Sequence, residues 1–108
     1  MRRLPPLNAL RVFEECARAL SFSAAAQTLC VTHSAVSHQI RQLEEWFGQK
    51  LFIRHAGGIA LTLSGETLQR TASQVLSQLE QTCAQLCQRP PRQELVIAAP
   101  ASFLANWL

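Results

Sequence analysis

The sequence contains no aspartate and no tyrosine, and Lys50 is its one lysine. Aspartate and lysine perform much of the acid–base and phosphoryl-transfer chemistry of enzymes, so their scarcity argues against those activities. Charged residues make up only 16% of the 108 residues, whereas apolar residues make up 48%. A chain this apolar is expected to fold, and its length suits one domain or a small domain with a long extension.

The sequence also lacks the cysteine spacing that is typical of a zinc site, and it lacks a segment long enough to cross a membrane. Its four cysteines form no Cys-x-x-Cys pair, and we interpret them as small apolar residues in a reducing cytosol. No apolar leader follows Met1, because Pro5 and Pro6 come almost at once. The most apolar stretch, residues 95–108, is too short to span a bilayer. We therefore expect a cytoplasmic protein that needs no membrane, metal or cofactor.

The excess of positive charge is confined to the first part of the chain. Residues 1–63 hold seven cations and four anions, whereas residues 64–108 hold three of each. The whole net charge of +3 therefore belongs to the first part. A locally basic region is typical of domains that bind nucleic acid.

Hydrophobic periodicity predicts two short helices and then a third helix with two unlike faces. The first two run over residues 7–20 and 23–29, with a cap from the segment 21–23. The third runs over residues 33–47, capped by Thr32 and ended by Gly48. Its apolar face, expected to pack on the first two helices, consists of Val36, Ile40, Leu43 and Phe47. Its opposite face is small, polar and cationic, and consists of Ser34, Ser37, His38 and Arg41.

This polar face is suited to a polyanion. Small hydroxyl side chains near the N-terminus let a helix approach base edges closely, and the helix dipole attracts phosphate there. Glu44 and Glu45 lie at the far end, where phosphate would repel them, so the N-terminal half is expected to face the polyanion. A short helix, a tight turn and a third helix form a helix-turn-helix, whose last helix enters the major groove of DNA.

The residues after the third helix predict a β-hairpin and a long fourth helix. Two apolar runs, residues 51–54 and 59–61, flank Ala56-Gly57-Gly58 and predict a wing with Arg54 and His55 near its tip. The fourth helix extends from a cap at Thr62 to about Cys87. Its apolar residues alternate four and three apart, as in a coiled-coil seam. We predict a homodimer held by this seam, whose members are Leu68, Ala72, Val75, Leu79 and Leu86.

The predicted fold class is therefore mainly α: a winged helix-turn-helix followed by a dimerisation helix. Pro90 and Pro91 end that helix, and residues 94–99 and 102–108 predict one strand and the opening of another helix. Those two elements cannot bury a core alone, so we expect the chain to stop at the entrance to a second domain. The expected divisions are a DNA-binding domain (5–62), a dimerisation helix (63–88), and a hinge with the truncated start of a second domain (89–108), which the resemblance described next implies is effector-binding.

Several segments resemble the N-terminal domain of LysR-type transcriptional regulators. They are residues 7–13, 21–26, 31–40, 43–44, 51–54 and 61–65. The resemblance runs over about residues 5–87 and is greatest to the subgroup around the glycine-cleavage and D-serine regulators. It implies a linker helix that pairs antiparallel in a dimer, often within a tetramer, and a C-terminal effector domain shaped like a periplasmic binding protein. A small-molecule effector is implied only where that domain is complete, and residues 100–103 would begin its pocket.

The resemblance also implies which residues contact double-stranded DNA. They are Thr32, Ser34, Ala35, Ser37, His38, Arg41 and Arg54, with Arg11 and Ser23 as further phosphate contacts. Thr32 caps the recognition helix, and Ala35 can contact a thymine methyl group. Arg41 binds a phosphate, and Arg54 reaches the minor groove or its backbone. Many relatives carry arginine where this chain has His38.

Sequence-specific regulation of transcription, by a homodimer on an inverted repeat, is thus the main hypothesis, and two others remain. The fourth helix alone would make the chain a coiled-coil interaction module. Cys83 and Cys87, four residues apart, would with a histidine make a redox or metal sensor on the same scaffold. An enzyme has the least support, because no nucleophile and base stand at a specific spacing. Salt-dependent DNA binding and thiol titration with zinc would separate the three hypotheses.

Overall fold

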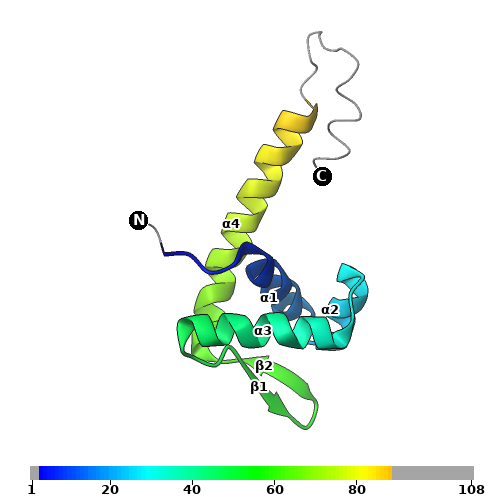
Figure 1. Cartoon of the computed structure of the whole chain (residues 1–108), viewed down its shortest axis with the longest axis vertical. Helices are drawn as coiled ribbons and strands as arrows, with labels where there is room; N and C mark the ends of the chain where they lie inside the picture. Colours follow the sequence, from blue (N-terminus) through cyan, green and yellow to red (C-terminus); the bar gives the residue numbers. More distant parts are fainter. Residues whose placement is uncertain (1–2, 89–108) are drawn as a thin grey trace. The chain divides into compact units, whose positions relative to one another are not determined.

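The computed structural model describes residues 3–88, which fall into two compact units divided between Leu76 and Ser77. The elements are α1 (Leu7–Ala19), α2 (Phe22–Leu29), α3 (His33–Phe47), β1 (Phe52–His55), β2 (Gly58–Leu61) and α4 (Leu63–Gln88) (Figure 1). The first unit contains all of them up to the first part of α4. No helix within residues 3–88 is both long and apolar enough to cross a membrane. The predicted strand and helix over residues 94–108 lie outside the described residues.

Helices α1 and α2 meet in a tight turn that is capped by a serine. Ser21 Oγ accepts a hydrogen bond from the backbone N–H of Ala24 at 3.1 Å. The second helix therefore begins at Phe22, one residue before the predicted start, because Ser21 is its N-cap. Both helices end at a residue in the left-handed conformation, Leu20 with φ of 52° and Cys30 with φ of 59°. Such a residue closes a helix abruptly and allows the next one to start at a steep angle.

The core of the first unit lies where α1, α2, α3 and the hairpin meet. Helix α1 packs on α2 and α3, and α2 packs on α3. The largest fully buried side chains are Phe13, Leu43, Leu51, Val36 and Cys16. Burying a leucine or phenylalanine side chain stabilises a fold by about 1.5–3 kcal/mol, so this core holds α3 firmly. Ile40 completes the predicted buried face of α3, whereas Phe47 remains 36% exposed at the end of that helix.

Strands β1 and β2 form a two-stranded antiparallel sheet, the wing. Phe52 pairs with Leu61, and His55 pairs with Gly58. Phe52 and Ile59 are buried and attach the wing to the core. The turn between the strands is Ala56-Gly57, which is shorter than predicted because His55 belongs to β1 and Gly58, with a φ of 138°, belongs to β2.

A threonine fixes the start of α4 against the segment that joins α3 to β1. Thr62 Oγ1 accepts from the N–H of Gly65 at 3.0 Å and donates to the carbonyl oxygen of Lys50 at 2.7 Å. The N–H of Thr62 donates to the carbonyl oxygen of Leu51 at 3.0 Å. Thr62 is therefore the cap that the sequence predicted, and it also ties α4 to the base of the wing.

The five residues of the predicted seam do not share one environment. Ala72 is fully buried in the core of the first unit, and Leu68 packs against that core. Val75 and Leu79 are each 44% exposed, and Leu86 is 66% exposed. Ala72 and Leu68 therefore cover the helices of their own unit, whereas the dimer contact of the predicted seam stays a prediction.

The cysteines also differ in environment. Cys16 is buried in α1, whereas Cys30, Cys83 and Cys87 are exposed. All four are free thiols, and the interpretation of them as small apolar residues made no statement about their burial. Burial, and then the charge of Glu15, raise the pKa of Cys16 to about 12. Among residues 3–88, no three histidine, cysteine or glutamate side chains gather into a group that could hold a metal ion.

Candidate nucleic-acid interface

The structure places most of the predicted contact residues on one accessible face of α3. Ser34, Ala35, His38 and Arg41 are exposed, and Ser37 is half-buried. Thr32 Oγ1 accepts from the N–H of Ala35 at 3.0 Å, which leaves the threonine O–H free to donate. The buried residues of α3 lie on the opposite side of the helix and orient this face outward. A small, polar and cationic face is therefore held in place by the core.

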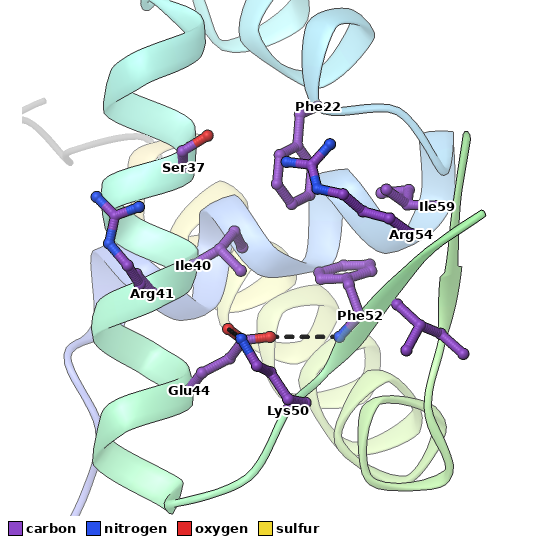
Figure 2. Close-up of a pocket in the computed structure, with 10 residues that line it drawn as sticks. Phe22, Ser37, Ile40, Arg41, Glu44, Lys50, Phe52, Arg54 and Ile59 are labelled. Carbon is purple, nitrogen blue, oxygen red and sulfur yellow. Dashed lines mark hydrogen bonds and ion pairs between the residues drawn. The ribbon is translucent and has the colours of Figure 1, made fainter. Parts of the chain in front are cut away.

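A groove of about 370 Å³ separates α3 from the wing (Figure 2). Its apolar lining consists of Phe22, Ile40, Phe52, Ile53 and Ile59. Its polar lining consists of Ser37, Arg41, Glu44, Lys50 and Arg54. Arg41 extends from α3, and Arg54 extends from β1 on the other side of the groove. The groove thus brings together three of the predicted DNA contacts, Ser37, Arg41 and Arg54.

An aromatic ring supports Arg54. Its guanidinium carbon lies 5.9 Å from the centroid of the Phe22 ring. Phe22 in turn meets Phe52 edge-on, with the two centroids 5.5 Å apart. A cation over an aromatic face gains about 0.5–1 kcal/mol at an exposed site, so Phe22 restrains Arg54 at the rim of the groove. Local spacing does not indicate this role of Phe22, because its partner Arg54 belongs to a different element.

Glu44 connects α3 to the wing. Its Oε2 accepts from the N–H of Leu51 at 2.9 Å and from the N–H of Phe52 at 3.4 Å. Its Oε1 lies 3.7 Å from Nζ of Lys50, and the glutamate side chain is only 12% exposed. Glu44 is thus turned toward the start of β1, whereas Glu45 remains exposed. No spacing rule could have predicted this, because the partners lie in a different element.

The remaining predicted residues lie elsewhere on the first unit. Arg11 is exposed on α1, where its guanidinium donates to Oδ1 of Asn8 at 3.1 Å. Ser23 is exposed on α2. Neither residue lines the groove, and Thr32 and His38 also lie outside it. The contacts predicted from the resemblance therefore lie in three places: the groove, the exposed face of α3 with its cap Thr32, and the exposed surfaces of α1 and α2.

Residues 7–66 match the family described as bacterial regulatory helix-turn-helix protein, lysR family. This chain belongs to the LysR family. It is 44% identical over 107 residues to the glycine cleavage system transcriptional activator of Escherichia coli K12, covering 99% of this chain and 35% of that protein. It is 43% identical over 106 residues to the regulator TrpI of Pseudomonas aeruginosa, covering 98% and 36%. The chain thus spans about a third of the length of these LysR-family relatives, and the predicted resemblance is confirmed.

Solved structures of LysR-family proteins share this fold. The complex of the BenM DNA-binding domain with catB site 1 DNA has a TM-score of 0.72 at 30% identity, covering 77% of this chain and 93% of that one. DarR of Vibrio fischeri in complex with DNA has a TM-score of 0.70 at 32% identity, covering 80% and 30%. The predicted winged helix-turn-helix with a following long helix is therefore confirmed as the fold of this LysR-family chain.

Proposed function

We propose that this chain is the DNA-binding part of a transcriptional regulator that acts on double-stranded DNA in the cytoplasm. Helix α3 enters the major groove, and the wing approaches the adjacent minor groove. The observation that carries this proposal is the position of Arg41 on α3 and Arg54 on β1 across one groove (Figure 2). Two relatives described as DNA complexes, the BenM domain and DarR, support it.

The contact residues have different tasks in this proposal. Ser34, Ala35 and His38 face base edges, because they are exposed on the accessible face of α3. Arg41 binds a phosphate beside the major groove. Arg54 is restrained at the rim by Phe22 and reaches toward the minor groove, where arginine is attracted by the negative potential of narrow A·T-rich segments.

The regulator binds as a homodimer to an inverted repeat. Val75, Leu79 and Leu86 are exposed apolar residues at the spacing of a helix seam, and they form the contact between the two α4 helices. Two-fold symmetry then places the two recognition helices on half-sites along one side of the duplex. Assembly into a tetramer and response to an effector belong to a longer protein with a complete second domain.

Replacing each groove arginine tests the proposal. Arg41→Ala is expected to weaken binding about equally on all sequences and to reduce the slope of log affinity against log salt by about one. Arg54→Ala is expected instead to reduce the preference for A·T pairs beside the major-groove contacts. Fluorescence anisotropy with labelled duplexes of varied sequence, over a range of salt concentrations, measures both effects.

Arg70→Ala provides the matched control for these variants. Arg70 is an exposed cation on α4 that does not line the groove, so its loss should leave the salt slope unchanged. Absence of salt-dependent duplex binding by the unmodified chain would overturn the proposal and favour the coiled-coil interaction module. Identical behaviour of the Arg41 and Arg54 variants on every sequence would remove the division of tasks between helix and wing.

A further inference from the structure

Lys50 is a cation of the groove that the sequence did not single out. It lies between α3 and β1 and lines the groove together with Arg41 and Arg54. Its side chain is 77% exposed. Figure 2 shows Lys50 beside Glu44 at one end of the groove, with Arg41 and Arg54 farther along its two sides. The groove therefore carries three cations from two elements and the segment that joins them.

The neighbouring glutamate positions Lys50 without cancelling its charge. Oε2 of Glu44 is occupied by the N–H groups of Leu51 and Phe52, so only Oε1 faces Lys50. The 3.7 Å separation of Nζ and Oε1 is long for a hydrogen bond, and an exposed ion pair contributes only about 0–1 kcal/mol. The ammonium carries three N–H donors, so it can bind a further anion while it remains beside Glu44.

The lining of the groove indicates what kind of anion it accepts. Its floor is apolar, with Ile40, Phe52 and Ile59 all buried, while its rim is cationic. A small free anion would make no favourable contact with the apolar floor, and an uncharged apolar ligand would make no ionic contact with the cationic rim. The sugar–phosphate backbone of one DNA strand matches both, because deoxyribose is largely apolar and each nucleotide carries one negative charge.

We propose that this groove holds the backbone of the DNA strand that separates the major groove from the minor groove, and that Lys50 is one of its phosphate contacts. This inference rests on the proposed DNA-binding function and extends it by one residue. Lys50 then links the contacts of α3 to those of the wing. Because a phosphate contact carries no sequence information, Lys50 contributes to affinity on every duplex.

The test compares Lys50→Gln and Lys50→Arg in the full chain, on a duplex of mixed sequence. Lys50→Gln should weaken binding several-fold at low salt and reduce the salt slope by about one, because one phosphate contact is lost. Lys50→Arg retains the charge and should retain the slope. Arg70→Gln, which removes an exposed cation outside the groove, is the matched control and should behave as the unmodified chain does.

The outcomes separate this inference from the proposed function. Salt-dependent binding by the unmodified chain, with an unchanged slope in Lys50→Gln, would overturn the role of Lys50 and leave the DNA-binding proposal standing. An equal loss in Lys50→Gln and Arg70→Gln would also overturn it, because the effect would then be one of overall charge. Failure of the unmodified chain to bind any duplex would overturn both. Thermal unfolding of each variant confirms that the compared proteins are folded.

Discussion

At the scale of single residues, Gly65 occupies a position that admits no side chain. A Cβ there would overlap the carbonyl oxygen of Leu51 and approach Cδ2 of Leu61 to 2.9 Å. The carbonyl cannot withdraw without losing the hydrogen bond that it accepts from the N–H of Thr62 at 3.0 Å. Because backbone would have to move, Gly65→Ala should destabilise the fold by about 1–3 kcal/mol or more, as measured by urea unfolding.

Gly57 offers a matched control for this substitution. A Cβ at Gly57 would come no nearer than 3.5 Å to the ring of His55, which is ordinary contact. Gly57→Ala should therefore change the midpoint of urea unfolding little. Similar losses of stability in the two variants would show that the close approach of backbone at the start of α4 is not the reason why position 65 requires glycine.

Cys16 gives the stability of the first unit a predictable dependence on alkaline pH. Burial, and secondarily the charge of Glu15, raise the pKa of this thiol from its ordinary 9.0 to about 12. The folded state therefore holds the thiol proton more tightly than the unfolded chain does. The resulting stabilisation is complete below about pH 9 and is lost as the pH rises toward 12.

Denaturant unfolding between pH 8 and pH 11 measures this effect, with about one pH unit between points. The unmodified chain should lose stability above pH 9, whereas Cys16→Ala should follow a flatter curve because it has no thiol to ionise. Cys30→Ala, which removes an exposed thiol, should keep the slope of the unmodified chain. Parallel curves for Cys16→Ala and the unmodified chain would contradict the linkage.

At the scale of the elements, Glu44 joins α3 to the start of the wing by hydrogen bonds. Its carboxylate accepts the N–H groups of both Leu51 and Phe52. Glu44→Ala leaves these donors without their acceptor in a partly buried place, which should cost about 1–3 kcal/mol of unfolding free energy. Glu45→Ala removes an exposed carboxylate next to it and should cost little. Equal midpoints of urea unfolding for the two variants would refute the coupling.

The elements were predictable where their signals are local. The bounds of α3, residues 33–47, follow from Thr32 as N-cap and Gly48 as the left-handed residue after the helix. These signals lie within one turn of the ends that they mark. The bond from Glu44 to the start of β1 was not predictable, because it joins residues seven and eight positions apart across a change of element.

At the scale of the whole molecule, the spacing of apolar residues alone did not reveal which part of the α4 seam is exposed to solvent. Ala72 and Leu79 obey the same heptad pattern, yet Ala72 is buried in its own unit and Leu79 is 44% exposed. What distinguishes them is the tertiary packing of the first turns of α4, which periodicity does not encode. The family and the fold were recognisable from the sequence, whereas the division of the seam required the structure.

The exposed seam residues Val75, Leu79 and Leu86 are the basis of a prediction about dimer formation. Leu79→Asp places a charge at the centre of the proposed contact, where it would be desolvated, and should convert dimers into monomers. Sedimentation velocity measures the change. Gln78→Asp introduces the same charge at an exposed neighbouring position outside the seam and should leave the dimer intact. An unchanged sedimentation coefficient for Leu79→Asp would refute α4 as the dimer contact.

The burial of Cys16 also makes the rate of its chemical modification a measure of the motions of the first unit. Once Cys30, Cys83 and Cys87 are blocked, an alkylating reagent can reach Cys16 only while the packed helices are briefly open. The rate at which the last thiol is modified then reports how often this opening occurs. A duplex that binds only the closed form would slow that rate in proportion to its occupancy, so DNA binding becomes readable by mass spectrometry without any added label.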